Sequence, residues 1–283
     1  MKLLLVDDRF PLALLEGFEV VHEPQEDVVA ALTVTRPVRG ELIERLPSLR
    51  VVGTASVGFD HIDVDAADAH GVAVVNVPDY CTQEVADHTL ALLYALLRGI
   101  VSLDRDVARG GWSAKAAGPL RTLAGMRVGI VGLGRIGGAV ATRLLALGAE
   151  VWAHDLLPVS REGVRFAALD ELLAECEAVT LHVPLTAETR GLVGRTEIEW
   201  MRPGALLVNT SRGAVVDEGA VILALRSGRL GGAALDVLVR EPPPMAPLAP
   251  NLILTPHAAY YSEASEARAP RLCVARMRDV LGA

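Results

Sequence analysis

Cysteine is scarce in this sequence and has no regular spacing. The 283 residues contain three cysteines, Cys81, Cys176 and Cys273, and no CxxC pair. An odd number of scattered cysteines is typical of neither a disulfide framework nor a zinc site. We therefore expect no metal site and a reducing, cytoplasmic environment.

Basic charge and long apolar runs near the N-terminus are also scarce. The 27 Lys and Arg residues are outnumbered by 35 Asp and Glu residues, which gives a formal net charge of -8. Nucleic acids and anionic membranes favour a basic face, so we expect neither as a partner. The N-terminal segment MKLLLVDDRF has an apolar run too short for a signal peptide or a membrane span, and it predicts a first β-strand.

Apolar residues are abundant, and they alternate between strand-like and helix-like patterns. Hydrophobic residues make up 51% of the chain, enough for the cores of two domains. The alternation predicts parallel sheets joined by crossover helices. The expected strands span residues 2–6, 28–34, 50–55, 72–76, 127–132, 150–155, 178–183, 205–210, 231–237 and 251–255. Because one small sheet cannot hold them all, we predict two doubly wound α/β domains.

A long helical pattern separates the first four strands from the other six. Residues 83–109 have apolar residues at helical spacing and no proline, so we predict one helix there and a domain boundary near residue 98. After His257 the chain continues as an amphipathic helix long enough to pack back on the first domain. The predicted domains are residues 1–97 with 259–283, and residues 98–258.

The most specific local motif is RVGIVGLGRIGGAVATRLLALGAEVWAHD. Gly132, Gly134 and Gly137 form GxGxxG between a strand and a helix, which suits a tight turn close to a pyrophosphate. Asp155 ends the next strand, where a carboxylate accepts hydrogen bonds from ribose hydroxyls and repels a 2′-phosphate. An ordinary strand–turn–helix connection is the alternative. The full order of elements favours a dinucleotide site, and NAD over NADP.

Three polar side chains follow three later strands. Arg212 follows residues 205–210, Glu241 follows residues 231–237, and His257 follows residues 251–255. Each alone could be structural, as a solvent-facing arginine, a surface acid before proline, or a satisfied core histidine. Ligands of doubly wound sheets bind at the carboxyl ends of the strands, so together they predict a substrate-handling site.

Six segments spread over nearly the whole chain carry a longer pattern. They are ASVGFDHIDVDAADAHGVAVVNVPDYCTQEVADHTLALL, VGLGRIGGAVA, LHVPLTAETRGLV, NTSRGAVVDEGAV, ALDVLVREP and TPHAAYYSEAS. In this order they resemble successive motifs of the D-isomer-specific 2-hydroxyacid dehydrogenases. NVPDYCTQEVADHT and YYSEAS look most like the branch that contains the C-terminal binding proteins, which are transcriptional corepressors. The resemblance implies a Rossmann NAD-binding domain inserted into a flavodoxin-like substrate domain.

The resemblance also implies roles for individual residues. The catalytic positions fall on Arg212, Glu241 and His257. The cofactor-binding positions fall on Gly132, Gly134, Arg135, Ile136, Gly137, Asp155, Thr210 and Asp236, of which Asp236 would face the nicotinamide carboxamide. The substrate-binding positions fall on Val57, Gly58, Asn76 and Arg212.

The chemistry implied by the resemblance is NAD-dependent interconversion of a small 2-keto acid and a D-2-hydroxy acid. Arg212 would grip the substrate carboxylate with its planar guanidinium. His257 would supply the proton during reduction, while Glu241 would hold the imidazole and favour its charged form.

A second interpretation is an NAD(H)-sensing interaction protein like the corepressor relatives, because the same three residues would be present in both. The resemblance also suggests a homodimer formed through the apolar helical region at residues 85–109. The chain stops soon after its last helix, so we do not expect an appended regulatory domain.

Overall fold

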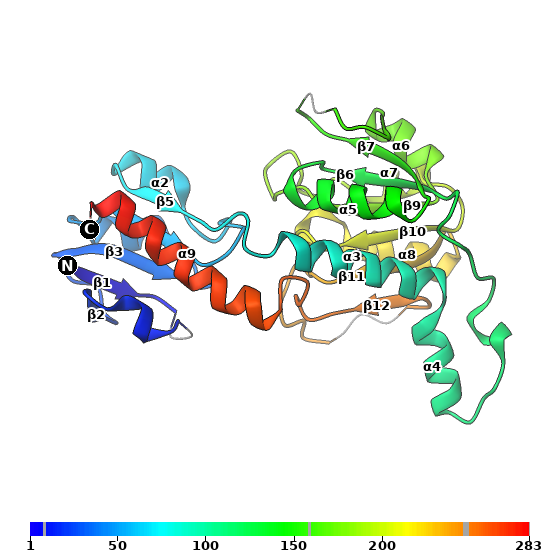
Figure 1. The fold of residues 1–283 in the computed structure, drawn as a ribbon, viewed down its shortest axis with the longest axis horizontal. Coiled ribbons are helices and arrows are strands. Elements are labelled where there is room, and N and C mark those ends of the chain that lie inside the picture. The colour runs from blue at the N-terminus through cyan, green and yellow to red at the C-terminus, as the bar shows by residue number, and fades with distance from the viewer. Residues whose placement is uncertain (8–9, 158–159, 246–248, 283) are drawn as a thin grey trace. The chain divides into compact units, whose positions relative to one another are not determined.

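The computed structural model describes residues 1–7, 10–157, 160–245 and 249–282 (Figure 1). The chain divides into a first unit, Met1–Cys81 with Tyr261–Ala283, and a second unit, Thr82–Tyr260. Each unit is built on a parallel sheet covered by helices. The predicted α/β class with two parallel-sheet domains is therefore confirmed.

The first unit has a five-stranded sheet with the order β2-β1-β3-β4-β5. Its strands are β1 (Lys2–Leu5), β2 (Glu19–Val21), β3 (Val28–Thr33), β4 (Val51–Thr54) and β5 (Ala73–Val75). Its helices are η1 (Leu12–Leu15), α1 (Gly40–Glu44), α2 (Val64–Ala69) and α9 (Glu263–Leu281). This strand order is that of the flavodoxin-like fold.

Helix α9 is the C-terminal segment that returns to the first unit, as predicted, and it packs on β4 and β5. Gly53 permits the close approach, because a Cβ atom there would lie 2.2 Å from Sδ of Met277 on α9. The chain ends in contact with the sheet with which it begins.

The second unit has a seven-stranded sheet with the order β12-β11-β10-β9-β6-β7-β8. Its strands are β6 (Arg127–Val131), β7 (Glu150–His154), β8 (Val164–Phe166), β9 (Ala178–Leu181), β10 (Ala205–Asn209), β11 (Leu230–Leu235) and β12 (Leu252–Leu254). The strand order reverses between β6 and β9, which is the topological switch point of a Rossmann sheet.

Helices cover both faces of the second sheet. They are α3 (Thr82–Leu97), α4 (Ile100–Ala108), η2 (Ala114–Ala117), α5 (Arg135–Ala146), α6 (Leu169–Glu175), α7 (Arg195–Trp200), η3 (Gly213–Val215) and α8 (Glu218–Ser227). Side chains of α3 and α5 share one buried cluster with the sheet, and those of α6, α7 and α8 share another.

All ten predicted strands are present, and two were missed. β2 (EVV) and β8 (VRF) contain two apolar residues each, whereas every predicted strand segment contains at least three.

The single helix predicted over residues 83–109 is wrong. The chain forms α3 and α4, which meet at an angle of 61°. Gly99 separates them in the left-handed region with a φ of 58°, a conformation that glycine adopts without strain. No described helix alone is long and apolar enough to cross a membrane, and only the bent pair of α3 and α4 passes that test, by length and composition.

The boundary between the units also differs from the prediction near residue 98. Helix α3 belongs to the second unit, because it packs on α5, β10 and β11. Its buried residues, such as Leu93, complete the core of that sheet. Apolar spacing along α3 predicted that it is buried, but not which sheet it packs against.

Candidate active site

The glycine-rich turn joins β6 to α5 at the switch point. Gly132 has a φ of 90°, and a Cβ atom there would lie 2.8 Å from the carbonyl oxygen of His182. A Cβ atom at Gly137 would lie 2.0 Å from the carbonyl oxygen of Gly132. At Gly134, no described atom lies within 4 Å of the same position. Packing therefore requires Gly132 and Gly137, whereas Gly134 borders open space that suits a ligand.

The start of α5 is arranged for an anion. Its first residues are Arg135 and Ile136, with Gly134 as the N-cap. The N–H of Gly138 donates to the carbonyl of Gly134 at 2.8 Å, so the N–H groups before it have no acceptor within the helix. Such groups bind the pyrophosphate of a dinucleotide.

Asp155 lies beside this turn, directly after β7. Its carboxylate accepts the N–H of Leu133 at 2.6 Å and that of Leu157 at 2.9 Å. A carboxylate oxygen has two lone pairs, so each oxygen can still accept a ribose hydroxyl. The turn, the helix start and the strand end together fit a dinucleotide cofactor.

His257 and Glu241, two of the predicted catalytic residues, form an ionisable pair. Nδ1 of His257 lies 2.7 Å from Oε2 of Glu241, and Oε1 of Glu241 accepts the N–H of Leu238 at 2.8 Å. Burial would raise the pKa of Glu241, but these two hydrogen bonds and the charge of His257 lower it below its ordinary value. The carboxylate is thus ionised at neutral pH and holds Nδ1 as a donor. Nε2 lies on the opposite side of a ring whose side chain is 41% exposed.

The backbone around His257 is strained and firmly held. His257 has a φ of 53°, which is uncommon for a residue with a side chain. Its N–H lies 2.7 Å from the carbonyl oxygen of Asp236 and 3.0 Å from that of Thr255. The Asp236 carboxylate accepts the N–H groups of Ala258 at 2.8 Å and Ala259 at 3.0 Å. We call residues 255–259 the histidine turn; it is anchored on Asp236 after β11.

Asp236 is buried, and its side chain is 0% exposed. Burial would raise its pKa, but the His88 ring 3.5 Å away and hydrogen bonds from Thr255 and the N–H groups of Ala258 and Ala259 lower it below the ordinary value of aspartate. The observed partners of its carboxylate belong to the protein. The predicted contact with the nicotinamide carboxamide therefore stays a prediction.

Arg212 lies after β10, on a loop that Asn209 shapes. The side chain of Asn209 donates to the carbonyl of Arg212 at 2.8 Å and accepts the N–H of Ser211 at 3.0 Å. Next to Arg212, a Cβ atom at Gly213 would lie 2.0 Å from the carbonyl carbon of Leu238, so this loop packs on the segment that leads to Glu241. Asn209 was missed from sequence, although an Asn at a strand end before Ser is typical of such a turn.

Thr210 is buried at the end of the same strand. Its hydroxyl lies 2.9 Å from that of Thr89 on α3, inside the second unit. Its predicted contact with the cofactor stays a prediction.

The predicted substrate loop lies in the first unit. Nδ2 of Asn76 donates to the carbonyl of Val57 at 2.6 Å, and the hydroxyl of Ser56 donates to the carbonyl of Gly58 at 2.6 Å. Arg276 on α9 donates to the carbonyl of Asn76 at 2.7 Å. The structure thus brings Val57, Gly58 and Asn76 together and shows Asn76 bracing the loop.

Comparison with known proteins shows the family to which the chain belongs. Residues 90–259 match the family "D-isomer specific 2-hydroxyacid dehydrogenase, NAD binding domain". The chain belongs to this family. It is an NAD-dependent D-2-hydroxyacid dehydrogenase.

Relatives of this dehydrogenase cover most of its length. It is 37% identical to the glycerate dehydrogenase of Methylorubrum extorquens over 87% of this chain and 80% of the relative. It is 41% identical to a glyoxylate reductase of Korarchaeum cryptofilum, over 88% of this chain and 79% of the relative. These relatives are named as enzymes, and they lend no support to the corepressor branch suggested by the sequence.

Solved structures resemble the dehydrogenase over its whole length. D-lactate dehydrogenase from Aquifex aeolicus, complexed with NAD and lactic acid, superposes with a TM-score of 0.90 at 29% identity and covers 100% of this chain and 96% of that one. The TT0316 protein from Thermus thermophilus superposes with a TM-score of 0.88 at 37% identity, covering 100% and 97%.

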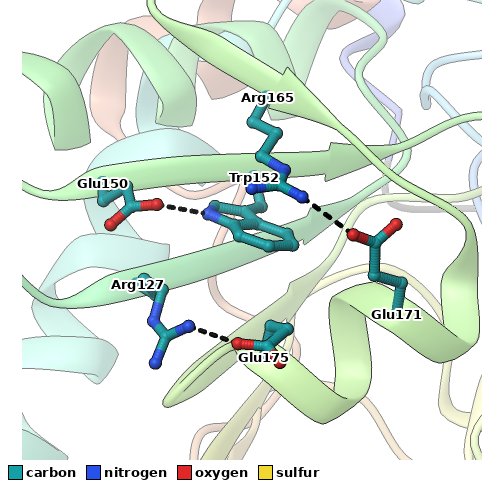
Figure 2. A pocket seen from close by; sticks show the side chains of 6 residues that line it. All are labelled: Arg127, Glu150, Trp152, Arg165, Glu171 and Glu175. Carbon is teal, nitrogen blue, oxygen red and sulfur yellow. Dashed lines mark hydrogen bonds and ion pairs between the residues drawn. The ribbon is translucent and has the colours of Figure 1, made fainter.

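The dehydrogenase also has a charged cleft of about 400 Å³ away from these residues (Figure 2). It is lined by Arg127, Glu150, Trp152, Arg165, Glu171 and Glu175. Its charges pair with one another: Arg127 with Glu175, and Arg165 with Glu171 at 2.9 Å. The cleft lies toward the amino ends of β6 and β7, the edge opposite the cofactor turn.

Proposed function

We propose that this dehydrogenase interconverts a small 2-keto acid and a D-2-hydroxy acid with His257 as the acid and base. The observation that carries the proposal is the pair between Nδ1 of His257 and the ionised Glu241 carboxylate at 2.7 Å. With Nδ1 engaged, Nε2 is the nitrogen available to the substrate.

The dinucleotide, when bound, would supply the hydride for reduction of the keto acid and accept it in the reverse direction. Arg212 binds the substrate carboxylate through its planar guanidinium, a geometry that a lysine lacks. Nε2 of His257 donates its proton to the carbonyl oxygen and becomes neutral, while Nδ1–H stays bonded to Glu241. In oxidation the neutral imidazole takes the hydroxyl proton.

The residues proposed to hold the cofactor divide by the group that they contact. The N–H groups at the start of α5, including those of Arg135 and Ile136, face the pyrophosphate. Asp155 accepts the ribose hydroxyls and repels a 2′-phosphate, so we propose that NAD is preferred over NADP. Thr210 and Asp236 complete the proposed set near the nicotinamide end.

We propose short keto acids as substrates, with glyoxylate and hydroxypyruvate first. The support is the names of the relatives, which include glycerate dehydrogenase and glyoxylate reductases. The deciding experiment measures NADH oxidation with a panel of 2-keto acids of increasing size. We expect turnover well above background on at least one short member. Tight NADH binding without turnover on any member would contradict the enzymatic role and favour an NAD(H)-sensing protein.

We further propose a homodimer formed through α4 and the segment that follows it. Within the second unit, α4 extends away from the sheet and has no buried residue (Figure 1). Ile100, Val107 and Trp112 are 54%, 51% and 90% exposed. Large exposed apolar side chains on one projecting element are typical of an interface. Light scattering at micromolar concentration tests this, and a monomer would contradict it.

We also propose a cytoplasmic location, supported by the three buried cysteine thiols. Cell fractionation tests it.

A further inference from the structure

His88 reaches the carboxylate that anchors the histidine turn. It lies on α3, and its Nε2 is 3.2 Å from Oγ1 of Thr255 and 3.5 Å from Oδ1 of Asp236. The residues that it meets lie more than one hundred positions along the chain, at the far end of the second unit's sequence. The proposed reaction has so far assigned no role to His88.

The hydrogen bonds around Thr255 have only one consistent direction. The Thr255 hydroxyl donates to Oδ1 of Asp236 at 2.5 Å, and a hydroxyl has a single hydrogen. It must therefore accept from His88, which requires a hydrogen on Nε2. The result is a relay from His88 through Thr255 to Asp236.

Asp236 depends on such donors because its carboxylate is sealed from solvent. A buried carboxylate is costly unless hydrogen bonds replace its hydration. Thr255, Ala258 and Ala259 supply three of these bonds, and all three belong to the histidine turn. His88 supports the same carboxylate from outside the turn, on a separate helix. It thus ties the turn to α3.

The orientation of His257 depends on this anchor. Its N–H bonds to the carbonyl of Asp236, and its φ of 53° needs surrounding contacts to persist. If the histidine turn loosens by a fraction of an ångström, Nε2 is misplaced for proton transfer. The glycine-rich turn after β6 is not affected by this change.

We propose that His88 is a positioning residue for the reaction: it donates through Thr255 to Asp236 and thereby holds the histidine turn in the geometry that proton transfer requires. This inference rests on the proposed acid and base role of His257.

The test compares two substitutions of His88 with one control. His88→Phe keeps a ring but removes the donor, and kcat for keto acid reduction should fall roughly 10-fold. His88→Gln keeps an N–H donor at similar reach and should stay within about 3-fold of the wild type. Asp87→Ala, on the same helix as His88, removes an exposed ion pair with Arg143 of α5 and should leave kcat unchanged. The Kd for NADH should be the same in all of them.

Equal losses in His88→Phe and His88→Gln would overturn the proposal, because they would point to packing and not to the donor. An unchanged kcat in His88→Phe would also overturn it.

A double-mutant cycle with Thr255→Val tests the relay. The valine keeps the shape of the threonine but interrupts the path to Asp236. If the relay acts as one unit, the double variant with His88→Phe should lose little more than either single variant. Fully additive losses would overturn the relay, and thermal unfolding of each variant confirms that it is folded.

An NMR measurement tests the inference independently of catalytic turnover. Imidazole ¹⁵N shifts should show hydrogen on Nε2 of His88, and the His257 signals should move in His88→Phe. An Nε2 of His88 without hydrogen, or unmoved His257 signals, would overturn the inference. If no keto acid is turned over while both NMR results hold, the proposed function fails and the relay stands.

Discussion

At the scale of single residues, the site depends on how carboxylates are partnered. Glu241 and Asp236 both have pKa values below the ordinary range, because hydrogen bonds outweigh the effect of burial. Their partners differ. The Glu241 carboxylate pairs with Nδ1 of the His257 ring, whereas the Asp236 carboxylate accepts hydrogen bonds from the backbone N–H groups of Ala258 and Ala259. One acid therefore fixes the tautomer of the imidazole, and the other holds the backbone that carries it.

His257→Gln should abolish most of the reduction while leaving the fold intact. Glutamine reaches a similar distance and still forms hydrogen bonds, but it cannot deliver a proton to the forming alkoxide. We expect kcat to fall on the order of 10²–10⁴-fold. NADH binding, measured by fluorescence, should be preserved and serves as the control. A variant that binds NADH normally and works within a few-fold of the wild type would rule out His257 as the acid.

Glu241→Gln should lower kcat for keto acid reduction while leaving the fold intact. The substitution replaces the carboxylate 2.7 Å from Nδ1 of His257 by an amide that can also donate a hydrogen bond, so Nδ1 is no longer held as the donor. Nε2 then carries the proton in only part of the molecules, and kcat should fall roughly 10-fold or more. Steady-state kinetics measure this, with NADH binding as the control. A kcat within about 2-fold of the wild type would contradict this role of Glu241.

Asp155→Ser should shift cofactor preference. Removing the carboxylate removes the ribose acceptor and the repulsion of a 2′-phosphate. The ratio of kcat/KM for NADH over NADPH should fall roughly 10-fold or more. Asp155→Asn is the matched control for the backbone contacts to Leu133 and Leu157, since its amide oxygen can still accept one of them. A wild type that already prefers NADPH would contradict this assignment.

At the scale of elements, the glycine-rich turn between β6 and α5 contains two glycines that packing requires, Gly132 and Gly137, and one that borders open space, Gly134. A Cβ atom at Gly137 would lie 2.0 Å from a backbone oxygen, and backbone cannot move aside cheaply. The same atom at Gly134 meets nothing described within 4 Å. A substitution at Gly137 should therefore affect folding, whereas a substitution at Gly134 should affect cofactor binding.

Gly137→Ala should destabilise the second unit, by about 1–3 kcal/mol, because β6 and α5 must move apart. Gly134→Ala should leave the unfolding free energy within about 1 kcal/mol of the wild type but weaken NADH binding, since the methyl group enters the space proposed for the pyrophosphate. Urea unfolding and NADH titration measure both. Equal destabilisation by the two variants would contradict the distinction.

At the scale of the whole molecule, several groups make stability depend on pH in the same direction. Glu241 and Asp236 have lowered pKa values, so the stability that they contribute is complete above their ordinary values of 4.5 and 3.8 and is lost as pH falls. Burial lowers the pKa of His182 from 6.5 to about 3, and its Nδ1 is a buried atom with no hydrogen-bond partner in the described structure. As the pH falls below 6.5, His182 therefore becomes protonated in the unfolded chain while it stays neutral in the folded protein.

The unfolding free energy should therefore drop between pH 7 and pH 5, where His182 is protonated only in the unfolded state. The drop from this residue should be about 1–2 kcal/mol. His182→Gln, which does not titrate, should show a smaller drop between the same two pH values. Urea denaturation at both pH values checks this, and an identical pH dependence in the two proteins would show that His182 titrates alike in both states.

The sequence by itself determined the local features of this protein. Ten strands, the GxGxxG turn with Asp155, and the strand-end positions of Arg212, Glu241 and His257 follow from short-range patterns. Apolar periodicity, strand-end polarity and turn glycines depend on neighbouring residues, so they can be read along the chain. The kink at Gly99 was missed because a single glycine inside a helical pattern is compatible with a continuous helix.

The tertiary structure alone decided which distant segments meet. The assignment of α3 to the second unit depends on its contacts with α5, β10 and β11. The anchoring of the histidine turn on Asp236, and the approach of His88 to Thr255, join residues far apart in sequence. No local pattern encodes such contacts, because they arise from the packing of whole elements, and side-chain type alone does not say which partner each polar group will find.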